Sequence, residues 1–382
     1  MDNLAHSLVG LAASKAGLEK LSPCATAVCI VSANVPDIDF LAALSGDRWT
    51  VLHHHRGLSH SIVGTLVLGL LVPTVFYVIG LVAARTRGQF TRLRFRGLLI
   101  ASLITAATHP ILDWTNSYGV RPLLPWSGQW FYGDIVFVVD PAIWVILGAG
   151  AFVLTAHSKR VLILWSLLAV LLTGLFVYSS FGGRGIDYPL AALTLWLFSL
   201  AAIALAHKAK LGNRLGPKAA VISLLILLAY WGTLSLLHER ALTVAREEVL
   251  KLSNQSGERV TRLVATPTVV NPIRWRCLAE TDRATYRFDV KVNGAGVEEL
   301  VRYEKPNRSE ADLVATSLED RRTKLFFEFA RFPVERILGA DCTSQTLVQF
   351  ADLRYTEPGR TRGSFSLEVP VDCPFSNSSD GR

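Results

Sequence analysis

The chain has few charged residues and few cysteines for its length. Only 18% of its 382 residues are charged, whereas 51% are hydrophobic. Soluble globular proteins carry about 25% charged residues, so this composition excludes an ordinary soluble protein. The five cysteines contain no CxxC spacing, which argues against a thiolate zinc site and against a disulfide scaffold.

The positions of the individual cysteines also argue against a thiolate zinc site and a disulfide scaffold. Cys24 and Cys29 fall in an apolar segment and are expected to pack there, while Cys277, Cys342 and Cys373 lie in the C-terminal part. One disulfide is possible among the last three, and its pairing stays open. The first residues also lack the basic region and the unbroken apolar core of a removable signal peptide, because polar His6 stands among them.

Hydrophobic residues gather before about residue 238, in runs that approach the roughly 20 residues needed to cross a bilayer. We predict spans at residues 62–84, 136–156, 161–181, 189–206 and 219–237, and weaker segments at 97–114, 4–18 and 23–44. Whether the first segments cross fully or form a re-entrant hairpin stays open. The expected fold class is a mainly α membrane protein, with a bundle of about seven or eight helical segments over residues 1–240.

The net charge of +8 does not indicate nucleic-acid binding, because the basic residues concentrate in short loops at 85–96, 159–160 and 208–218. In the loops at 116–134 and 182–188, the only basic residues are Arg121 and Arg184. The positive-inside rule places the basic loops in the cytoplasm. We therefore expect a multi-pass protein of the bacterial inner membrane, with residues 53–60 and the region after 237 on the other side.

Beyond Ser253 the hydrophobic pattern changes to a period of two. Apolar residues alternate with polar ones over 286–292 and again over 365–371, and Asn293-Gly294 supplies a turn. Residues 241–382 are therefore predicted to form a small, mostly antiparallel β domain outside the membrane. Residues 238–252 are expected to extend the last helix, and the tail at 376–382 is expected to be disordered.

Acids and histidines stand beside or inside the apolar segments, where such groups need a partner or a metal ion. His109 and Asp113 are four residues apart, so on a helix they share one face, although Pro110 lies between them. Asp37 and Asp39 are two apart, which in a turn or extended segment places both carboxylates on one side. For His109 and Asp113, the alternative is an interfacial histidine with an aspartate at the end of a helix. For Asp37 and Asp39, the alternative is a turn that terminates a helix.

The run from residue 53 to 61 contains four histidines. His60 begins a span and is the preferred ligand, with His55 second, while His53 and His54 are expected to be exposed. Arg56 suits an anionic oxygen such as a phosphate, and simple anchoring at the interface is the equal alternative.

Two more candidates lie elsewhere in the membrane region. His6 is a further candidate ligand, although a lone histidine on an apolar face is usually structural. Asp140, at the outer end of a span, is a candidate ligand, base or support for a ligand.

These motifs resemble the YdjM/YbcI-type membrane-bound metal-dependent hydrolases. The resemblance rests on residues 37–39, 55–61, 109–114 and 140–141, and on the C-terminal segments 271–275 and 331–334. The family is thought to be related to zinc-dependent phospholipase C and the S1/P1 nucleases. There an N-terminal histidine, an aspartate, two histidines and a bridging aspartate hold part of a zinc cluster. The resemblance implies that the candidate ligands follow the same order along this chain. The further histidine and aspartate ligands of the relatives have no counterpart after Asp113, which favours one or two ions.

We therefore expect a metal-dependent hydrolase, with a phosphoester of a lipid or cell-envelope molecule as substrate and the bilayer as its environment. The cofactor is one or two divalent ions, expected to be zinc. The candidate ligands are His6, Asp37, Asp39, His55, His60, His109 and Asp113, and the candidate catalytic residues are Asp39, Arg56 and Asp140. The alternatives are an ion-coupled transporter or channel and a non-catalytic envelope scaffold, but confinement of the polar groups to the first 140 residues favours an enzyme.

Overall fold

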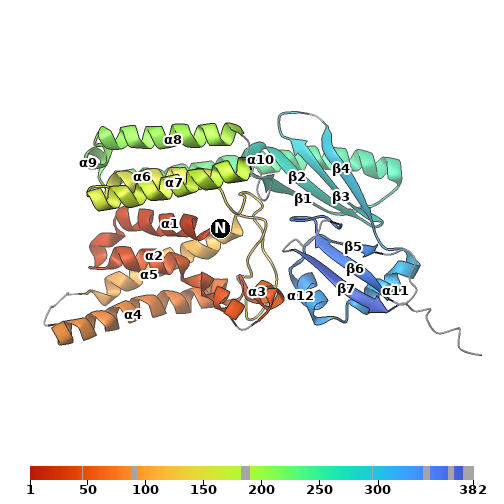
Figure 1. Ribbon diagram of the computed structural model, residues 1–382, viewed down its shortest axis with the longest axis horizontal. Coiled ribbons are helices and arrows are strands. Elements are labelled where there is room, and N and C mark those ends of the chain that lie inside the picture. The colour runs from red at the N-terminus through yellow and green to blue at the C-terminus, as the bar shows by residue number, and fades with distance from the viewer. Residues whose placement is uncertain are drawn as a thin grey trace, which may run out of the picture. The chain divides into compact units, whose positions relative to one another are not determined.

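The computed structural model describes residues 1–44, 46–87, 93–181, 190–294, 296–338, 345–359 and 365–372 (Figure 1). The chain forms two compact units. Unit 1 comprises Met1–Asp39, Arg56–Leu236 and Pro267–Pro272, and unit 2 comprises Phe40–His55, Leu237–Thr266 and Ile273–Arg382. The predicted loop at 182–188, Cys342, Cys373 and the tail at 376–382 lie outside the described residues.

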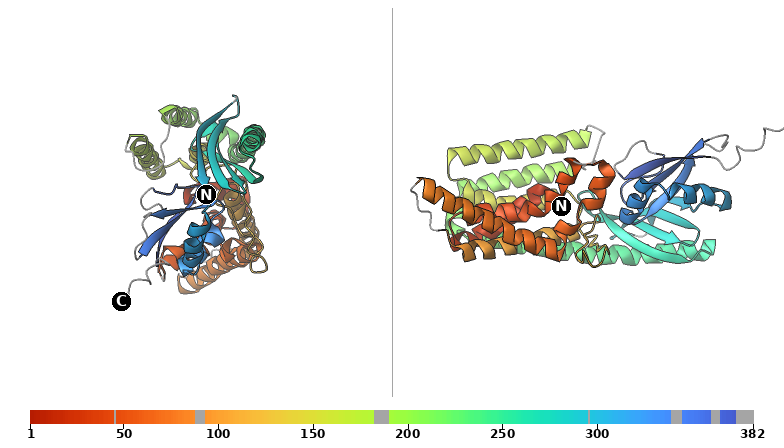
Figure 2. Two further views of the ribbon diagram at one scale, coloured as in Figure 1. Left: turned by 90° about the vertical axis from the view of Figure 1, so that its right-hand side faces the viewer. Right: turned by 90° about the horizontal axis from the view of Figure 1, so that it is seen from below.

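Unit 1 is a bundle of helices. Its α-helices are α1 (Asn3–Lys15), α2 (Ala25–Asn34), α4 (Ile62–Arg87), α5 (Phe95–Trp114), α6 (Pro141–Thr155), α7 (Lys159–Phe181), α8 (Leu190–Lys208), α9 (Leu211–Leu215) and the first part of α10 (Lys218–Ser256). Short 3-10 helices join them, namely η1 (Leu18–Leu21), η2 (Val35–Leu44) and η3 (Leu58–His60). Helices α1, α2, α4 and α5 pack side by side (Figures 1 and 2).

Within the described residues, six helical segments are long and apolar enough to cross a bilayer. They are Ala25–Leu44, Ile62–Thr86, Phe95–Trp114, Lys159–Ser180, Leu190–Lys208 and Lys218–Ser256. Many of their large apolar side chains face outward, for example Val170 and Leu171 on α7, which are 71% and 70% exposed. Such faces need an apolar solvent. The predicted class, a mainly α membrane protein with a C-terminal antiparallel β domain, is confirmed.

Two of the expected segments are shorter than predicted. Helix α6 begins at Pro141 instead of residue 136 and has 15 residues, because the Asp140 carboxylate caps its N-terminus and Pro141 occupies its first position. Helix α1 ends at Lys15. The prediction that Cys24 packs in an apolar segment is wrong, since Cys24 precedes α2 in a left-handed conformation and is exposed. Cys29 is buried between α2 and its neighbours as expected.

The long helices of unit 1 alternate in direction, so their connections gather at two ends. One end, on the left of Figure 1, contains the end of α1, the turn from α6 to α7, and α9. The basic residues Arg94, Lys159 and Lys210 lie in or beside these connections. The opposite end contains the start of α1 and the ends of α2 and α5, and it is here that the histidines and acids meet.

Unit 2 contains two antiparallel sheets. The first has the order β1-β2-β3-β4, and the second has the order β5-β6-β7. The strands are β1 (Val260–Thr268), β2 (Asn271–Thr281), β3 (Ala284–Lys291), β4 (Val297–Glu304), β5 (Pro333–Leu338), β6 (Gln345–Asp352) and β7 (Ser366–Asp372). The two predicted strands are β3 and β7. The thiol of Cys277 lies in the core of the first sheet, where burial raises its pKa.

Helices complete unit 2. Helix α10 continues without a break through residues 238–252, as predicted, and buries Ala241, Val244 and Ala245 against the first sheet. The other helices are α3 (Arg48–His54), α11 (Arg308–Ser317) and α12 (Arg321–Phe329). Helix α3 packs on α12, with the rings of Trp49 and Phe326 at a centroid distance of 6.4 Å. A segment from the early part of the chain is thus built into the β-rich unit.

Candidate metal site

Four side chains from three segments converge at one end of unit 1. Asp37 is on η2, His60 is on η3, and His109 and Asp113 are on α5. One donor atom from each lies within 4.8 Å of one donor atom of every other. His60, His109 and Asp113 are fully or almost fully buried. The predicted convergence of histidines and acids is therefore present in the structure.

The distances within this group, from 3.0 to 3.5 Å, are close to those between ligands of a single ion. The Nε2 atom of His60 is 3.0 Å from Nε2 of His109, 3.4 Å from Asp37 Oδ1 and 3.2 Å from Asp113 Oδ2. Nε2 of His109 is 3.5 Å from each of the same two carboxylate oxygens. Ligands placed about 2.0–2.2 Å from a tetrahedral zinc ion lie about 3.3–3.6 Å apart. The donor set therefore fits a divalent cation.

The other nitrogen of each imidazole is held by an oxygen. Nδ1 of His109 is 2.7 Å from the carbonyl oxygen of Ala33, so this nitrogen donates. Ala33 is near the end of α2, where carbonyl groups lack a partner within the helix. Nδ1 of His60 lies 3.2 Å from the carboxylate of Asp39. Both Nε2 atoms therefore direct lone pairs toward the same point, which is the tautomer that a metal ion requires.

Asp37 and Asp39 contact different nitrogens of the same ring, His60. One carboxylate oxygen of Asp37 lies within 4.8 Å of one of Asp39, in agreement with the predicted placement of both carboxylates on one side. The segment forms the 3-10 helix η2 in place of the expected turn or extended segment. Helix α2 stops just before it, because Pro36 lacks a backbone donor. As a result, Asp37 joins the four donors and Asp39 supports one of them.

The position of His60 depends on a close approach between η3 and α4. A Cβ atom built on Gly64 would overlap the carbonyl oxygen of Leu58. The hydroxyl of Ser59 donates to Asp39 and lies 3.0 Å from Nδ1 of His60. The backbone N–H of Arg56 also donates to Asp39, at 2.9 Å. Residues 56–60 are therefore held to η2 by one carboxylate.

Arg56 is buried and faces Asp113. Its Nη2 atom is 3.0 Å from Asp113 Oδ1, and its Nη1 atom donates to the side chain of Asn116 and to the carbonyl of Gly119. Its guanidinium also lies over the ring of Tyr118, 4.5 Å from the centroid. Arg56 has a φ of 57°, a left-handed conformation that costs an arginine about 1–2 kcal/mol. These contacts indicate a guanidinium that holds Asp113 in place.

The second oxygen of Asp113, Oδ1, faces several nitrogen atoms. Besides Arg56, the amino group of Met1 contacts Oδ1 of Asp113. Nε2 of His6 lies 3.5 Å from the same oxygen. The ring of His6 is stacked on that of His109 at a centroid distance of 3.7 Å, and neither ring nitrogen of His6 makes a hydrogen bond within the described part of the chain. His6 is therefore adjacent to the four donors, on the side of the Oδ1 atom of Asp113.

The remaining candidates are not among these four donors. His55 belongs to unit 2, where its ring is 4.4 Å from that of Phe40. In the same unit His53 pairs with Glu328 at 2.9 Å and His54 is exposed. Asp140 caps α6 and accepts a hydrogen bond from the hydroxyl of Tyr230 at 2.7 Å. Among the described residues, Asp140 does not belong to the group of donors that contains His60 and His109.

Sequence reasoning missed three contributors to the site. They are Asn116 and Tyr118, which hold Arg56, and the carbonyl of Ala33, which holds His109. Asn116 carried a usable signal, since it is a polar residue directly after a span that contains ligand candidates. A backbone carbonyl and an aromatic ring give no such signal.

The fold and the donor group define a multi-pass membrane protein with a buried His/Asp site at one end of its helical bundle. Residues 1–185 match the family described as YdjM inner membrane protein, which confirms the predicted resemblance for the part of the chain that contains the site. The chain is also similar to the uncharacterized protein YfhP of Bacillus subtilis (strain 168), with 26% identity over 155 residues. That match covers 38% of this chain and 43% of YfhP, so it spans less than half of the relative. No solved structure matches the chain significantly.

Proposed function

We propose that the protein is a membrane-bound metal-dependent hydrolase that acts on a phosphoester. The observation that carries this proposal is the set of four donors from Asp37, His60, His109 and Asp113 at the spacing of zinc ligands. A divalent ion held there supplies an activated water and polarises a phosphoryl oxygen. Imidazole and carboxylate donors with an all-nitrogen-and-oxygen set suit zinc.

The surrounding residues orient these donors. Asp39 and the carbonyl of Ala33 hold the protons of the two imidazoles away from the ion. Arg56 fixes the second oxygen of Asp113, and with its guanidinium engaged by four oxygen atoms it acts as a positioning residue. The catalytic roles predicted for Asp39, Arg56 and Asp140 stay predictions, and the contacts of Asp140 favour a helix-capping role.

The charges around Asp113 favour one ion over two. Its Oδ2 atom faces His60 and His109, whereas its Oδ1 atom already contacts the guanidinium of Arg56 and the amino group of Met1. A second divalent cation on that side would be repelled by the guanidinium of Arg56. His6, whose Nε2 atom lies 3.5 Å from this oxygen, stays a candidate ligand.

Orientation in the membrane follows from the basic connections. The positive-inside rule places the end of unit 1 with Arg94, Lys159 and Lys210 in the cytoplasm. The donor group at the other end then faces the extracytoplasmic side, and so does unit 2, which follows the last span. Hydrolysis would occur at the outer surface of the inner membrane.

The experiment compares two double variants of the full-length protein purified in detergent. We expect His60→Ala with His109→Ala to lose the bound metal, measured by elemental analysis, and to lose hydrolysis of phosphoester lipids. His53→Ala with His54→Ala, two histidines of unit 2 with no place among the four donors, is the matched control and should retain both. Full metal content in the first variant would refute the site. Metal-loaded protein that hydrolyses no phosphoester but carries zinc across a liposome membrane would refute the hydrolase and support a transporter.

A further inference from the structure

An apolar groove lies between α4, α5 and the segment that follows α5. Its volume is about 460 Å³, within the range of about 300–1,000 Å³ that small-molecule sites occupy. The residues that line it include His60, Thr65, Leu66, Ile111, Trp114 and Phe131. The outer segment is fixed in place, because Val120 and Phe131 form a β-bridge and the N–H of Ile62 donates to the carbonyl of Pro122.

The groove connects the lipid-facing surface with the donor group. On α4 and α5, Leu66 and Ile111 are each 52% exposed, and they lie on segments that qualify as membrane spans. His60 also lines the groove, although it is fully buried, and its Nε2 atom belongs to the four donors. The groove therefore extends from the lipid-facing side to one residue of the donor group, near Trp114, which ends α5.

One polar group in the groove lacks a partner. Thr65 is 7% exposed, and its hydroxyl makes no hydrogen bond within the described residues. Leaving a buried hydroxyl unsatisfied costs about 1–3 kcal/mol, so such a group usually has a ligand or a water to bind. An oxygen at the polar end of a lipid would satisfy it.

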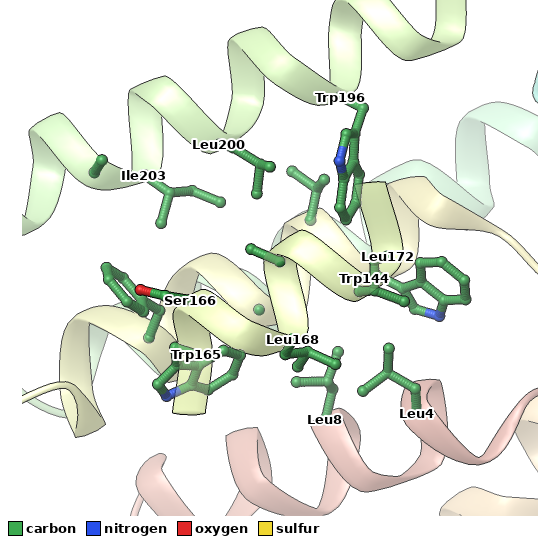
Figure 3. Close-up of a pocket in the computed structure, with 15 residues that line it drawn as sticks. Leu4, Leu8, Trp144, Trp165, Ser166, Leu168, Leu172, Trp196, Leu200 and Ile203 are labelled. Carbon is green, nitrogen blue, oxygen red and sulfur yellow. The ribbon is translucent and has the colours of Figure 1, made fainter. Parts of the chain in front are cut away.

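A second apolar cavity shows the contrast. It lies between α1, α6, α7 and α8 and has a volume of about 190 Å³ (Figure 3). The indole N–H groups of Trp144, Trp165 and Trp196, which line it, all donate to oxygens elsewhere. The hydroxyl of Ser166, which also lines it, donates to the carbonyl of Leu162, so the polar groups named here are already paired within the protein.

We propose that the groove binds the hydrocarbon tail of a lipid that enters laterally between α4 and α5, with its polar end at His60. The inference rests on the proposed function and names its substrate class. Because His60 both lines the groove and belongs to the donor group, the bond that is cleaved lies directly beside the tail. The substrate class is a phosphate monoester of a long-chain alcohol, and not a phosphate at the far end of a large headgroup.

The reaction balances with water alone. Water forms the new bond to phosphorus, the bond between phosphorus and the alkoxy oxygen breaks, and the leaving oxygen takes a proton from that water. The products are the long-chain alcohol, which returns to the bilayer, and inorganic phosphate, which leaves into water.

The first test uses the full-length protein in lipid nanodiscs with hexadecyl phosphate and butyl phosphate as substrates. Ile111→Trp fills the groove, and Ile104→Trp is the matched control: it lies two turns earlier on α5, is 47% exposed and does not line the groove. We expect Ile111→Trp to lower kcat/KM for hexadecyl phosphate about tenfold or more while changing that for butyl phosphate by about twofold at most. Ile104→Trp should resemble the wild type with both. Equal activities of the two variants on hexadecyl phosphate would overturn the inference.

The second test needs no hydrolysis and so separates the two proposals. A hexadecyl phosphate with a photoreactive diazirine on its chain is cross-linked to the wild type and to the His60→Ala, His109→Ala variant, and the labelled peptides are mapped by mass spectrometry. Labels on the groove residues of α4 and α5 in both proteins would support the groove even if no hydrolysis is found. Labels spread evenly over lipid-facing helices, or concentrated at Leu200 and Ile203 of the cavity in Figure 3, would overturn it even if hydrolysis is found.

Discussion

The carboxylate of Asp39 lies 3.2 Å from Nδ1 of His60, while the other ring nitrogen of His60 faces the remaining donors. The same carboxylate oxygen accepts hydrogen bonds from the backbone of Arg56 and from the hydroxyl of Ser59. One acidic side chain thus holds the ring of His60, a candidate ligand, in its orientation. This arrangement leads to the first prediction.

Asp39→Asn should weaken zinc binding without abolishing it. An amide in place of the carboxylate still fills the space but makes His60 a poorer ligand, and such changes typically cost about 10–100-fold in metal affinity. Asp37→Asn should cost more, since it removes a donor atom. Competition against a zinc chelator measures both. Asp47→Asn, at the exposed cap of α3, is the control and should bind zinc like the wild type, because asparagine caps a helix as well as aspartate. An unchanged affinity in Asp39→Asn would contradict the positioning role.

Arg56 should be required for stability as well as for metal binding. Arg56→Gln leaves the buried carboxylate of Asp113 without its guanidinium, and breaking a buried ion pair costs about 3–5 kcal/mol. Arg56→Lys keeps the charge but loses the fork that also reaches Asn116 and Gly119, so it should recover only part of the loss. Thermal unfolding in detergent, with and without added zinc, gives the order wild type, Lys, Gln. If both variants unfold at the wild-type temperature, the guanidinium has another role.

Gly64→Ala should displace His60. The added methyl group meets the carbonyl oxygen of Leu58, which belongs to η3, so η3 must move away from α4. We expect a lower unfolding temperature and a weaker affinity for zinc. Gly174→Ala in α7, where the methyl group meets nothing within 4 Å, is the matched control and should be neutral or stabilising, because alanine favours the helix by about 1 kcal/mol. Equal zinc affinities of the two variants would show that η3 has room to adapt.

The stability of the β-rich unit should fall as the pH rises from about 4.5 to 7. Burial, opposed by the charge of Lys305 and assisted by that of Glu280, raises the pKa of Glu335 on β5 from 4.5 to about 7. In this window the folded unit keeps a proton that the unfolded chain releases, so the free energy of unfolding decreases with pH and then levels off. Amide hydrogen exchange of β5 and β6 in the full-length protein, corrected for intrinsic rates, should show this loss of protection. Glu335→Gln should abolish it, and a slope that persists in that variant would assign the dependence to another group.

Much of the fold follows from local patterns. Long apolar runs mark α4, α5, α7, α8 and α10, because each run interacts with the bilayer along its own length. The start of α6 was misplaced, since hydropathy does not register the cap at Asp140. The packing of α3 on α12 could not be predicted, because the contact joins Trp49 to Phe326 across more than half of the chain and neither segment signals the other.

The site was predictable where its geometry is local. His109 and Asp113 share a helix face at a spacing of four, and that pair is among the four donors. The choice between Asp37 and Asp39 was not predictable, because it depends on the 3-10 helix that α2 becomes after Asn34. His55, which was also named as a candidate ligand, is not among these four donors, and its role stays a prediction.

Because the ring of His109 donates a hydrogen bond to the carbonyl of Ala33, the geometry of the site depends on the length of α2. Inserting a single alanine before Pro36 would leave the hydropathy of the segment almost unchanged, but it would turn everything beyond it by about 100°. Asp37 would then point away from the imidazoles. Among proteins with the same apolar profile, the spacing between the end of this helix and its first aspartate therefore separates those able to bind an ion from those that only share the architecture.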